Sequence, residues 1–405
     1  MDFCFVKTES LKNIDSKTAQ HRFQPHNKRV FRCLRAEKRI ASKSKVKVVM
    51  ISFPIRDVPT MFIKGFTADD VQTILEFVRR ADSHSMARTR DVLFIDTPIT
   101  GPTVEAVHKL KAEGYRVIYR DHHAVEGEPA SDRDVQVIKA TEKLRQKLGA
   151  DCLITTRGLH PACSTLVSVG EFKDALAIVA DPDADGLTAA MKAVGIFYDE
   201  MDEDAAKLDG QPSLQVTGSA ISQLLAKGVA TLPTYDAERP HERERAQEKL
   251  FWQWVSAVEG DERAVQALQG GVTAYDAAVL AAHEIAPKAQ EVAPGVVLAD
   301  VTLTPFFDVG TLLSLLEMRP GCKVTVIKKA QGPIAALHGI QYSLAVAKDF
   351  QDEIKFPSLL PPHAKSDPAG GIITNLSFLL HVNDAVWKEH ILPGLRSLPQ
   401  HSQTR

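Results

Sequence analysis

The chain has 405 residues, 44% hydrophobic and 25% charged, so it is long enough to form two domains that each bury a core. Its formal net charge of −2 excludes a protein that is basic throughout, so we expect any contact with nucleic acid to use a local groove. No run approaches the roughly 18 apolar residues of a membrane span, and the five cysteines lack Cys-x-x-Cys spacing, so we expect no membrane partner and reduced thiols in the cytoplasm.

The amino-terminal segment differs in charge from the rest of the chain. Residues 1–47 carry 13 Lys and Arg against 4 Asp and Glu. We expect residues 1–45 to be a basic, disordered extension, or upstream sequence preceding a start at Met50. A nucleic-acid-binding arm and a transit peptide are the other interpretations of this composition.

Residues 46–200 alternate between strand and helix patterns. Apolar runs typical of strands alternate with segments of helical periodicity. The expected strands cover residues 46–51, 91–96, 115–120, 152–155 and 176–180, and the expected helices cover residues 68–80, 102–113 and 138–148. This order predicts an α/β domain built on a doubly wound parallel sheet.

The remainder of the chain divides into two further regions. Residues 201–290 have a helical pattern and are expected to form a helical linker region. Residues 291–395 are expected to form a smaller carboxyl-terminal α/β domain, with strands at 296–301 and 323–327 and a helix at 308–318.

Three of the expected strands end on an aspartate. These residues are Asp96, Asp121 and Asp181, and Asp121 continues into His122 and His123. In an open parallel sheet the carboxyl ends of the strands meet at one edge, so we expect the three carboxylates to converge there. Carboxylates with one imidazole suit Mn²⁺ or Mg²⁺. One or two such ions would neutralise the cluster and support displacement at phosphorus.

The sequence Asp121-His122-His123, placed 25 residues after Asp96, resembles the DHH phosphoesterase superfamily. This superfamily includes RecJ-type exonucleases, nano-RNases, cyclic-dinucleotide phosphodiesterases and pyrophosphatases. The resemblance implies that Asp96, Asp121, His122 and Asp181 bind metal. It also implies that Asp121 and His123 are catalytic, with His123 facing the phosphate. It covers residues 46–200 well and residues 290–385 weakly.

The first motif of the superfamily is altered in this chain. Members usually have His-x-Asp-x-Asp-Gly between a strand and a helix, whereas here Gly65 and Thr67 occupy the expected positions of the histidine and the first aspartate. Asp69 is the remaining aspartate, and the resemblance assigns it to the metal. The site has therefore lost ligands for one of two ions unless other residues replace them.

The run from Asp181 to Gly186 is spelled Asp-x-Asp-x-Asp-Gly, like the missing first motif. Our hypothesis is that Asp183 and Asp185 supply the carboxylates that the first motif lacks. The run does not fit a calcium-binding EF-hand loop, because position twelve is Lys192 rather than glutamate. The plainer alternative is a strand-to-helix turn in which an aspartate caps the helix.

The carboxyl-terminal domain resembles the appended substrate-binding domain of the same superfamily. That domain carries a glycine-rich turn ending in histidine, and the corresponding residues here are Gly370 and Gly371, followed by Ile372. Backbone N–H groups at successive glycines approach an anion closely. We expect Gly370 and Gly371 to bind substrate, with His363 in place of the missing histidine. A plain Gly-Gly turn is the alternative.

The resemblance implies a Mn²⁺-dependent phosphoesterase that hydrolyses a phosphodiester bond in a small nucleotide or a short single-stranded oligonucleotide. Two alternatives stay open at this point. The first is a degenerate member of the superfamily that binds nucleotides or nucleic acid without turnover. The second is a phosphoanhydride hydrolase such as a pyrophosphatase. The sequence does not specify an oligomeric state.

Overall fold

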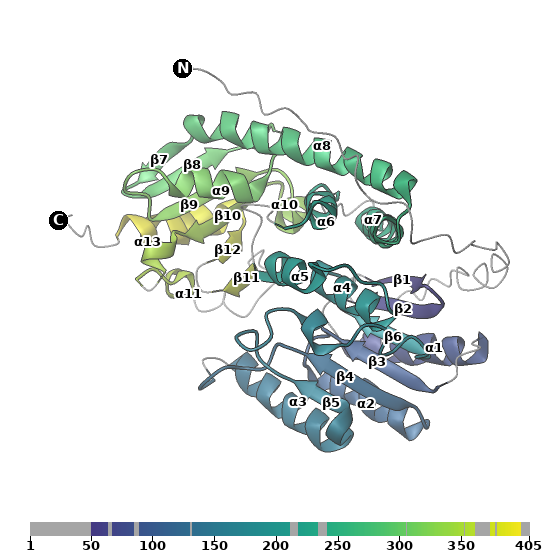
Figure 1. Ribbon diagram of the computed structural model, residues 1–405. Coiled ribbons are helices and arrows are strands. Elements are labelled where there is room, and N and C mark those ends of the chain that lie inside the picture. Colours follow the sequence, from purple (N-terminus) through teal and green to yellow (C-terminus); the bar gives the residue numbers. More distant parts are fainter. Residues whose placement is uncertain are drawn as a thin grey trace. The chain divides into compact units, whose positions relative to one another are not determined.

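The computed structural model describes residues 50–63, 67–84, 89–129, 132–210, 218–233, 241–304, 306–351, 353–360, 373–376 and 379–397. Within these ranges the strands form two six-stranded sheets (Figure 1). The expected α/β class is confirmed, because helices and strands are mixed along the chain in the regions of both sheets.

The first sheet has the strand order β1-β2-β6-β3-β4-β5. Its strands are β1 (Met50–Ile55), β2 (Val58–Ile63), β3 (Asp91–Ile95), β4 (Arg116–Asp121), β5 (Cys152–Ile154) and β6 (Ala177–Ala180). Strands β2, β6, β3, β4 and β5 are mutually parallel, and β1 pairs antiparallel with β2 at the edge. The sheet is therefore mostly parallel, as the alternating pattern predicted.

Both faces of this sheet are buried because apolar residues point to each side in turn. In β3, Leu93 and Ile95 belong to one core, and Val92 and Phe94 belong to the other. The core of Val92 and Phe94 includes residues of α1 (Ala68–His84), α2 (Gly101–Ala112) and α3 (Asp132–Leu148). The opposite core includes residues of α4 (Ala184–Ala193). This arrangement is the doubly wound one, and it explains why the strands have continuous apolar runs.

Helices occupy most of the described residues between 201 and 285. They are α5 (Met201–Gly210), α6 (Ala220–Ala230), α7 (Glu242–Val258) and α8 (Glu262–Ile285). Trp254 of α7 is fully buried, and its Nε1 donates a hydrogen bond to the carbonyl of Ile221, 2.9 Å away. Leu268 of α8 packs in the core beside the first sheet, and Ala282 packs in a core of the second. One long helix therefore contributes to two cores.

The second sheet has the strand order β11-β12-β10-β9-β8-β7. Its strands are β7 (Gln290–Ala293), β8 (Val296–Asp300), β9 (Val324–Lys329), β10 (Gln341–Val346), β11 (Ile373–Leu376) and β12 (Leu379–Val382). Strands β8 and β9 are parallel, and the other neighbours are antiparallel. The helices of this region are α9 (Val309–Glu317), α10 (Pro333–His338), α11 (Phe356–Leu359), α12 (Asp384–Val386) and α13 (Leu392–Arg396).

The first strand extends beyond the sequence prediction. A strand was expected over residues 46–51, of which residues 46–49 lie outside the described residues; β1 continues to Ile55 and is followed by β2, with which it forms a hairpin. Pro54 and Pro59 lie opposite each other in this hairpin. Proline is tolerated at these positions because Pro54 lies in the edge strand β1, and Pro59 precedes Thr60, where β2 begins to pair with β6.

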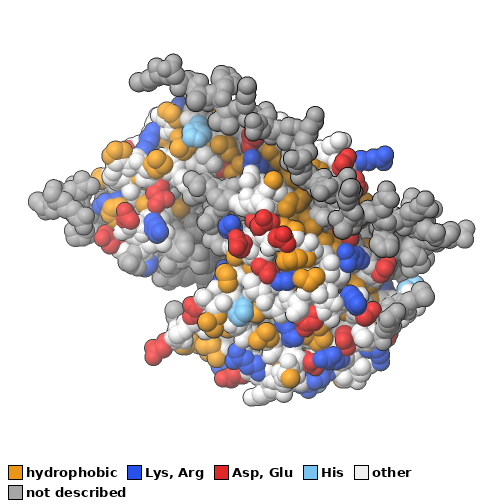
Figure 2. Space-filling view, viewed as in Figure 1, with side chains coloured by type: hydrophobic (Ala, Val, Ile, Leu, Met, Phe, Trp, Pro, Cys, Tyr) orange, Lys and Arg blue, Asp and Glu red, His pale blue; other side chains and the backbone are white. Residues whose placement is uncertain are grey.

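The surface carries charges of both signs. On the face shown in Figure 2, Lys and Arg side chains are interspersed with Asp and Glu side chains over the described residues, without an extended area of basic side chains. None of the helices in the described ranges is both long enough and apolar enough to cross a membrane.

Candidate metal centre

Asp96 and Asp121 lie at the carboxyl edge of the first sheet. Strands β3 and β4 are parallel neighbours, so Asp96, directly after β3, and Asp121, the last residue of β4, reach the same edge. Asp96 has a φ of +56°, and its N–H donates to the carbonyl of Arg120 at 2.9 Å. Aspartate tolerates this left-handed conformation better than most residues. The chain therefore turns at Asp96 while the residue stays attached to the neighbouring strand.

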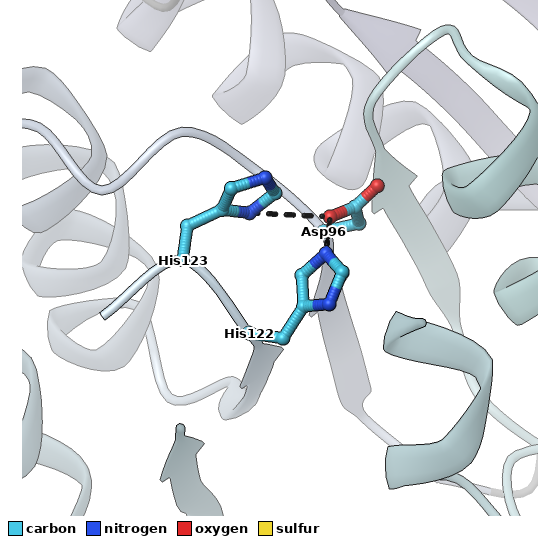
Figure 3. A group of neighbouring side chains, drawn as sticks. All are labelled: Asp96, His122 and His123. Carbon is cyan, nitrogen blue, oxygen red and sulfur yellow. Dashed lines mark ion pairs between the residues drawn. The ribbon is translucent and has the colours of Figure 1, made fainter. Parts of the chain in front are cut away.

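Asp96, His122 and His123 form the first cluster of potential ligand atoms (Figure 3). Oδ1 of Asp96 lies 3.5 Å from Nε2 of His122 and 3.4 Å from Nδ1 of His123. The two histidine rings point toward this one carboxylate from consecutive residues, as Figure 3 shows. Oδ1 of Asp121 also approaches His123, at 3.3 Å from Nδ1, and accepts a 2.6 Å hydrogen bond from the His123 N–H.

A backbone carbonyl orients the ring of His122. Its Nδ1 lies 2.8 Å from the carbonyl oxygen of His160, so Nδ1 carries a proton and donates it to that oxygen. Burial lowers the pKa of His122, which leaves the ring neutral near pH 7. The lone pair of Nε2 is then directed at the carboxylates. A histidine that binds metal through one nitrogen commonly donates the other N–H to a carbonyl in this way.

His122, Asp185 and Asp209 form the second cluster. Nε2 of His122 lies 3.3 Å from Oδ2 of Asp185 and 3.7 Å from Oδ2 of Asp209. Asp185 comes from the first turn of α4 and Asp209 from the last turn of α5. The N–H of Cys163 donates to Asp185, with Oδ2 at 2.8 Å, and fixes this carboxylate. The two clusters share one nitrogen atom.

Several atoms of the two clusters are buried without a hydrogen-bond partner among the described residues. They are both carboxylate oxygens of Asp96, Oδ2 of Asp121, Nε2 of His122 and Oδ2 of Asp209. Buried polar groups normally have partners, because an unpaired group costs about 1–3 kcal/mol. Oxygen ligands with one imidazole form the donor set of a hard divalent cation such as Mn²⁺ or Mg²⁺. These residues therefore fit such an ion.

The carboxylates of the centre also have shifted protonation equilibria. Burial, followed by the charges of Asp183, Asp185 and Asp121, raises the pKa of Asp96 well above the usual range of an aspartate. Burial and then the charge of Asp183 raise the pKa of Asp185 in the same direction. Burial raises the pKa of Asp209, although the neighbouring Arg157 opposes the shift. A cation at the centre would reverse these shifts by favouring the charged carboxylates.

The strand-to-helix turn after β6 explains why aspartate and glycine occur at these positions in residues 181–186. Asp183 is the N-cap of α4, and its Oδ1 accepts a hydrogen bond from the Gly186 N–H at 2.8 Å. A Cβ atom at Gly186 would lie 2.4 Å from the carbonyl oxygen of Asp181, so only glycine fits. This close turn places Asp185 in the first turn of the helix, with its carboxylate facing His122.

The structure therefore separates the aspartates that the sequence grouped together. It brings Asp96, His122, His123 and Asp185 into the clusters and places Asp121 beside them. Asp183 caps a helix, and Asp181 is half-buried outside both clusters. The negative charges of Asp183 and Asp181 both raise the pKa of Asp96.

Asp69, expected at the metal, is exposed in the first turn of α1 and is in neither cluster. The next residue, Asp70, is the buried one, and its Oδ2 accepts hydrogen bonds from the N–H and the hydroxyl of Thr67, each at 2.6 Å. The altered first motif thus serves as a helix start in this chain. The expected substrate-binding residues Gly370, Gly371 and His363 lie outside the described residues.

Asp209 is not among the site residues predicted from the sequence. It lies in a helix whose sequence, Met-Asp-Glu-Asp-Ala-Ala-Lys-Leu-Asp-Gly, contains four acidic residues and is typical of a solvated surface. The side chain of Asp209 is 9% exposed, unlike that of an ordinary surface aspartate. No spacing in the sequence distinguishes it from its neighbours, because only the packing of α5 beside α4 brings it to His122.

The chain is similar to some solved structures, whereas no family model and no curated protein matches it. One similar solved structure is described as the DHH domain of a member of a family of ribosomal proteins. It has 15% identity and a TM-score of 0.36, and the match covers 78% of this chain and 71% of that one.

Another similar structure is a pGpG-specific phosphodiesterase, PggH from Vibrio cholerae. It has 13% identity and a TM-score of 0.34, and the match covers 75% of this chain and 98% of that one. The first of the two structures carries the DHH domain that the sequence motifs resemble. At these TM-scores neither likeness carries an argument about function, so the support for a function lies in the geometry of the site.

Proposed function

We propose that this protein is a metal-dependent phosphoesterase that hydrolyses phosphodiester bonds in small nucleotides or short oligonucleotides, with Mn²⁺ or Mg²⁺ as its cofactor. One observation carries the proposal. Nε2 of His122, whose lone pair is free, has carboxylate oxygens of Asp96, Asp185 and Asp209 within 3.3 to 3.7 Å. A buried lone pair that faces three ionised carboxylates is repelled by them unless a cation lies among them.

The residues would hold ions at two adjoining positions. Asp96 and His122 face the first position, where Asp121 and His123 lie near, and Asp185, Asp209 and His122 face the second. Divalent ions bound at such positions supply Lewis acidity toward phosphoryl oxygens and make water a better nucleophile near neutral pH. Asp185 and Asp209 thus replace the carboxylates that the altered first motif lacks.

The remaining groups orient the reaction. His123 is 38% exposed in its side chain, unlike the fully buried His122, so it is the histidine that a substrate phosphate can reach. Asp121 fixes His123 through the backbone N–H and lies beside its Nδ1. We assign to His123 a hydrogen bond to the phosphate, or proton donation to it. The carbonyl of His160 keeps His122 in the tautomer that binds metal.

The choice of a phosphodiester rests on the sequence resemblance to the DHH phosphoesterases. The site geometry by itself favours displacement at phosphorus with divalent ions, and a phosphoanhydride satisfies the same geometry. The substrate class is therefore decided by assay, with a phosphodiester and inorganic pyrophosphate compared under the same conditions.

The test is hydrolysis of bis-p-nitrophenyl phosphate and of a dinucleotide with Mn²⁺, together with calorimetric titration of Mn²⁺. We expect metal-dependent turnover that His122→Ala and Asp121→Ala abolish, with loss of Mn²⁺ binding in His122→Ala. His108→Ala, at an exposed histidine of α2, is the matched control and should behave like the unsubstituted protein.

Two outcomes would overturn this function. Mn²⁺ binding without turnover of either substrate would support a binding protein that has lost catalysis. Turnover of pyrophosphate alone would support a phosphoanhydride hydrolase.

A further inference from the structure

A single arginine links the two clusters. Arg157 lies in the turn that follows β5, and its Nη2 contacts Oδ1 of Asp209 at 2.9 Å and Nε2 of His123 at 2.6 Å. The first contact reaches the second cluster, and the other reaches the first cluster. The guanidinium therefore lies at the boundary between the two proposed ion positions, and its side chain remains 50% exposed.

Hydrogen bonds fix the turn that carries Arg157. The N–H groups of Leu159 and His160 donate to the carbonyl of Thr156 at 3.1 and 2.9 Å. The N–H of Gly158 donates to Oε1 of Glu126 at 3.0 Å, and a Cβ at Gly158 would lie 2.8 Å from that oxygen. The same turn presents the His160 carbonyl that orients His122. Arg157 thus extends from a backbone segment that already positions the centre.

Charge and hydrogen-bonding capacity distinguish this residue. In the part of the chain that the structure describes, Arg157 is the one arginine or lysine that forms an ion pair with a carboxylate of either cluster. A guanidinium has five N–H donors, and both hydrogen bonds of Arg157 within the described residues come from Nη2. Its Nε and Nη1 donors have no partner there, so they are available to an anion that enters from solvent.

We propose that Arg157 is a substrate-binding residue that donates hydrogen bonds to the non-reacting oxygens of the substrate phosphate. This inference rests on the proposed function and names a residue that binds the anionic group at that site. Arginine suits the task because it stays charged and its donors match phosphate oxygens. Asp209 holds the guanidinium in place. The contact between Nη2 and Nε2 of His123 opens when the phosphate arrives, which frees that ring nitrogen for the phosphate. Its neighbour His123, also exposed, lies where it can contact the same phosphate.

The experiment compares Arg157→Ala and Arg157→Lys with Arg116→Ala. Arg116 is the matched control, because it is also an exposed arginine paired with an aspartate, Asp151, but starts β4 at the opposite end of the strand. Inorganic phosphate is titrated calorimetrically into the Mn²⁺-loaded proteins, and KM and kcat are measured with bis-p-nitrophenyl phosphate. We expect Arg157→Ala to weaken phosphate binding and raise KM by roughly tenfold to a hundredfold. Arg157→Lys should recover part of the loss, and Arg116→Ala should show none.

Two further measurements separate binding from a structural role. Guanidinium chloride at non-denaturing concentration should restore part of the activity of Arg157→Ala and none to Arg116→Ala. Mn²⁺ affinity in Arg157→Ala should be unchanged or higher, because the carboxylate of Asp209 loses a competing cation. Weaker Mn²⁺ binding without a change in phosphate affinity would overturn the proposal and leave Arg157 as a support for Asp209.

The outcome for Arg157 can be distinguished from that for the proposed function. If the unsubstituted protein binds no Mn²⁺ and hydrolyses nothing, the proposed function is wrong and the substrate-binding role fails with it. If it binds Mn²⁺ and turns over substrate while Arg157→Ala keeps its phosphate affinity and KM, only the role of Arg157 is wrong.

Discussion

Each sheet of this protein carries a buried group of polar side chains, and the two groups are satisfied to different degrees. In the second sheet, Oε1 of Gln341 accepts from the Ile334 N–H at 3.1 Å and Nε2 of Gln341 donates to Ser343 at 3.1 Å. Ser343 in turn lies 3.0 Å from Nδ1 of His381. At the carboxyl edge of the first sheet, by contrast, atoms of Asp96, His122 and Asp209 have no partner among the described residues.

The difference indicates what each group does. In the described part of the second sheet, no buried side-chain polar atom is without a partner, as expected of a network that stabilises a fold. The group in the first sheet lowers the stability of the metal-free protein, since its carboxylates are buried and face one another. Such an arrangement persists in a binding site because a ligand completes it.

Among the substitutions that compare the two groups, the largest effect should come from Asp209, a proposed metal ligand that was not predicted from the sequence. We expect Asp209→Asn to lower kcat/KM for bis-p-nitrophenyl phosphate by at least about a hundredfold and to weaken Mn²⁺ binding, because the second cluster loses a charged ligand. Asp151→Asn, at a half-buried aspartate that is likewise paired with an arginine but lies outside both clusters, is the control and should retain activity. Full activity in Asp209→Asn would contradict the assignment of Asp209 as a metal ligand and favour Asp181 in its place.

Removal of metal should change stability in a pH-dependent way. The raised pKa values of Asp96, Asp185 and Asp209 lie above the unfolded value of about 3.9. These groups therefore stabilise the metal-free protein fully below about pH 4, and that contribution is lost as the pH rises through the raised values.

Mn²⁺ requires deprotonated ligands, so its stabilising effect should grow over the same range. At a free concentration of 100 times Kd it should reach about 2.7 kcal/mol. Urea unfolding in EDTA and in Mn²⁺ at several pH values measures the difference. A gain that is independent of pH would contradict ligation by these carboxylates.

The second sheet should respond to acid in the opposite direction. Burial, followed by the charge of Lys329, lowers the pKa of His381 to about 4. For a lowered histidine pKa, the stability is present above the unfolded value of about 6.5 and is lost as the pH falls through about 4. We expect a loss on the order of 2 kcal/mol over this range. The difference in free energy of unfolding between the unsubstituted protein and His381→Asn should shrink accordingly. If this difference stays constant, His381 is not buried as a neutral ring.

Two single substitutions, one in each group of polar side chains, should give the smallest effects on the free energy of unfolding, and these effects should be of opposite sign. Asp96→Asn removes a buried charge while keeping a residue that tolerates the left-handed conformation, so we expect it to raise the free energy of unfolding in EDTA by about 1 kcal/mol. Ser343→Ala leaves its partners unsatisfied and should lower that free energy by about 1 kcal/mol. Destabilisation by both variants would show that the two groups are equally satisfied in the metal-free protein.

The local sequence pattern determined the strands of the first sheet and the edge at which they end. The strands ending near Asp96, Asp121 and Asp181 could be predicted because parallel strands buried on both faces give continuous apolar runs. Their common edge followed from the alternation of strand and helix, which allows few topologies. His122 and His123 followed from their place directly after Asp121. The β1–β2 hairpin could not be predicted, since its prolines are tolerated only because β1 lies at the edge and β2 pairs with β6 from Thr60 on, and this pairing is set by the tertiary structure.

Tertiary structure decided which carboxylates meet. Asp69, Asp183 and Asp185 occupy similar strand-to-helix positions in the sequence, yet one is exposed, one caps α4, and one faces His122. Asp209 resembles any surface aspartate until α5 packs beside α4 and brings it within 3.7 Å of the same nitrogen. The physical reason is that strand ends converge through a regular, repeated geometry that a local pattern specifies. The approach of two helices, in contrast, depends on side-chain packing across the whole core.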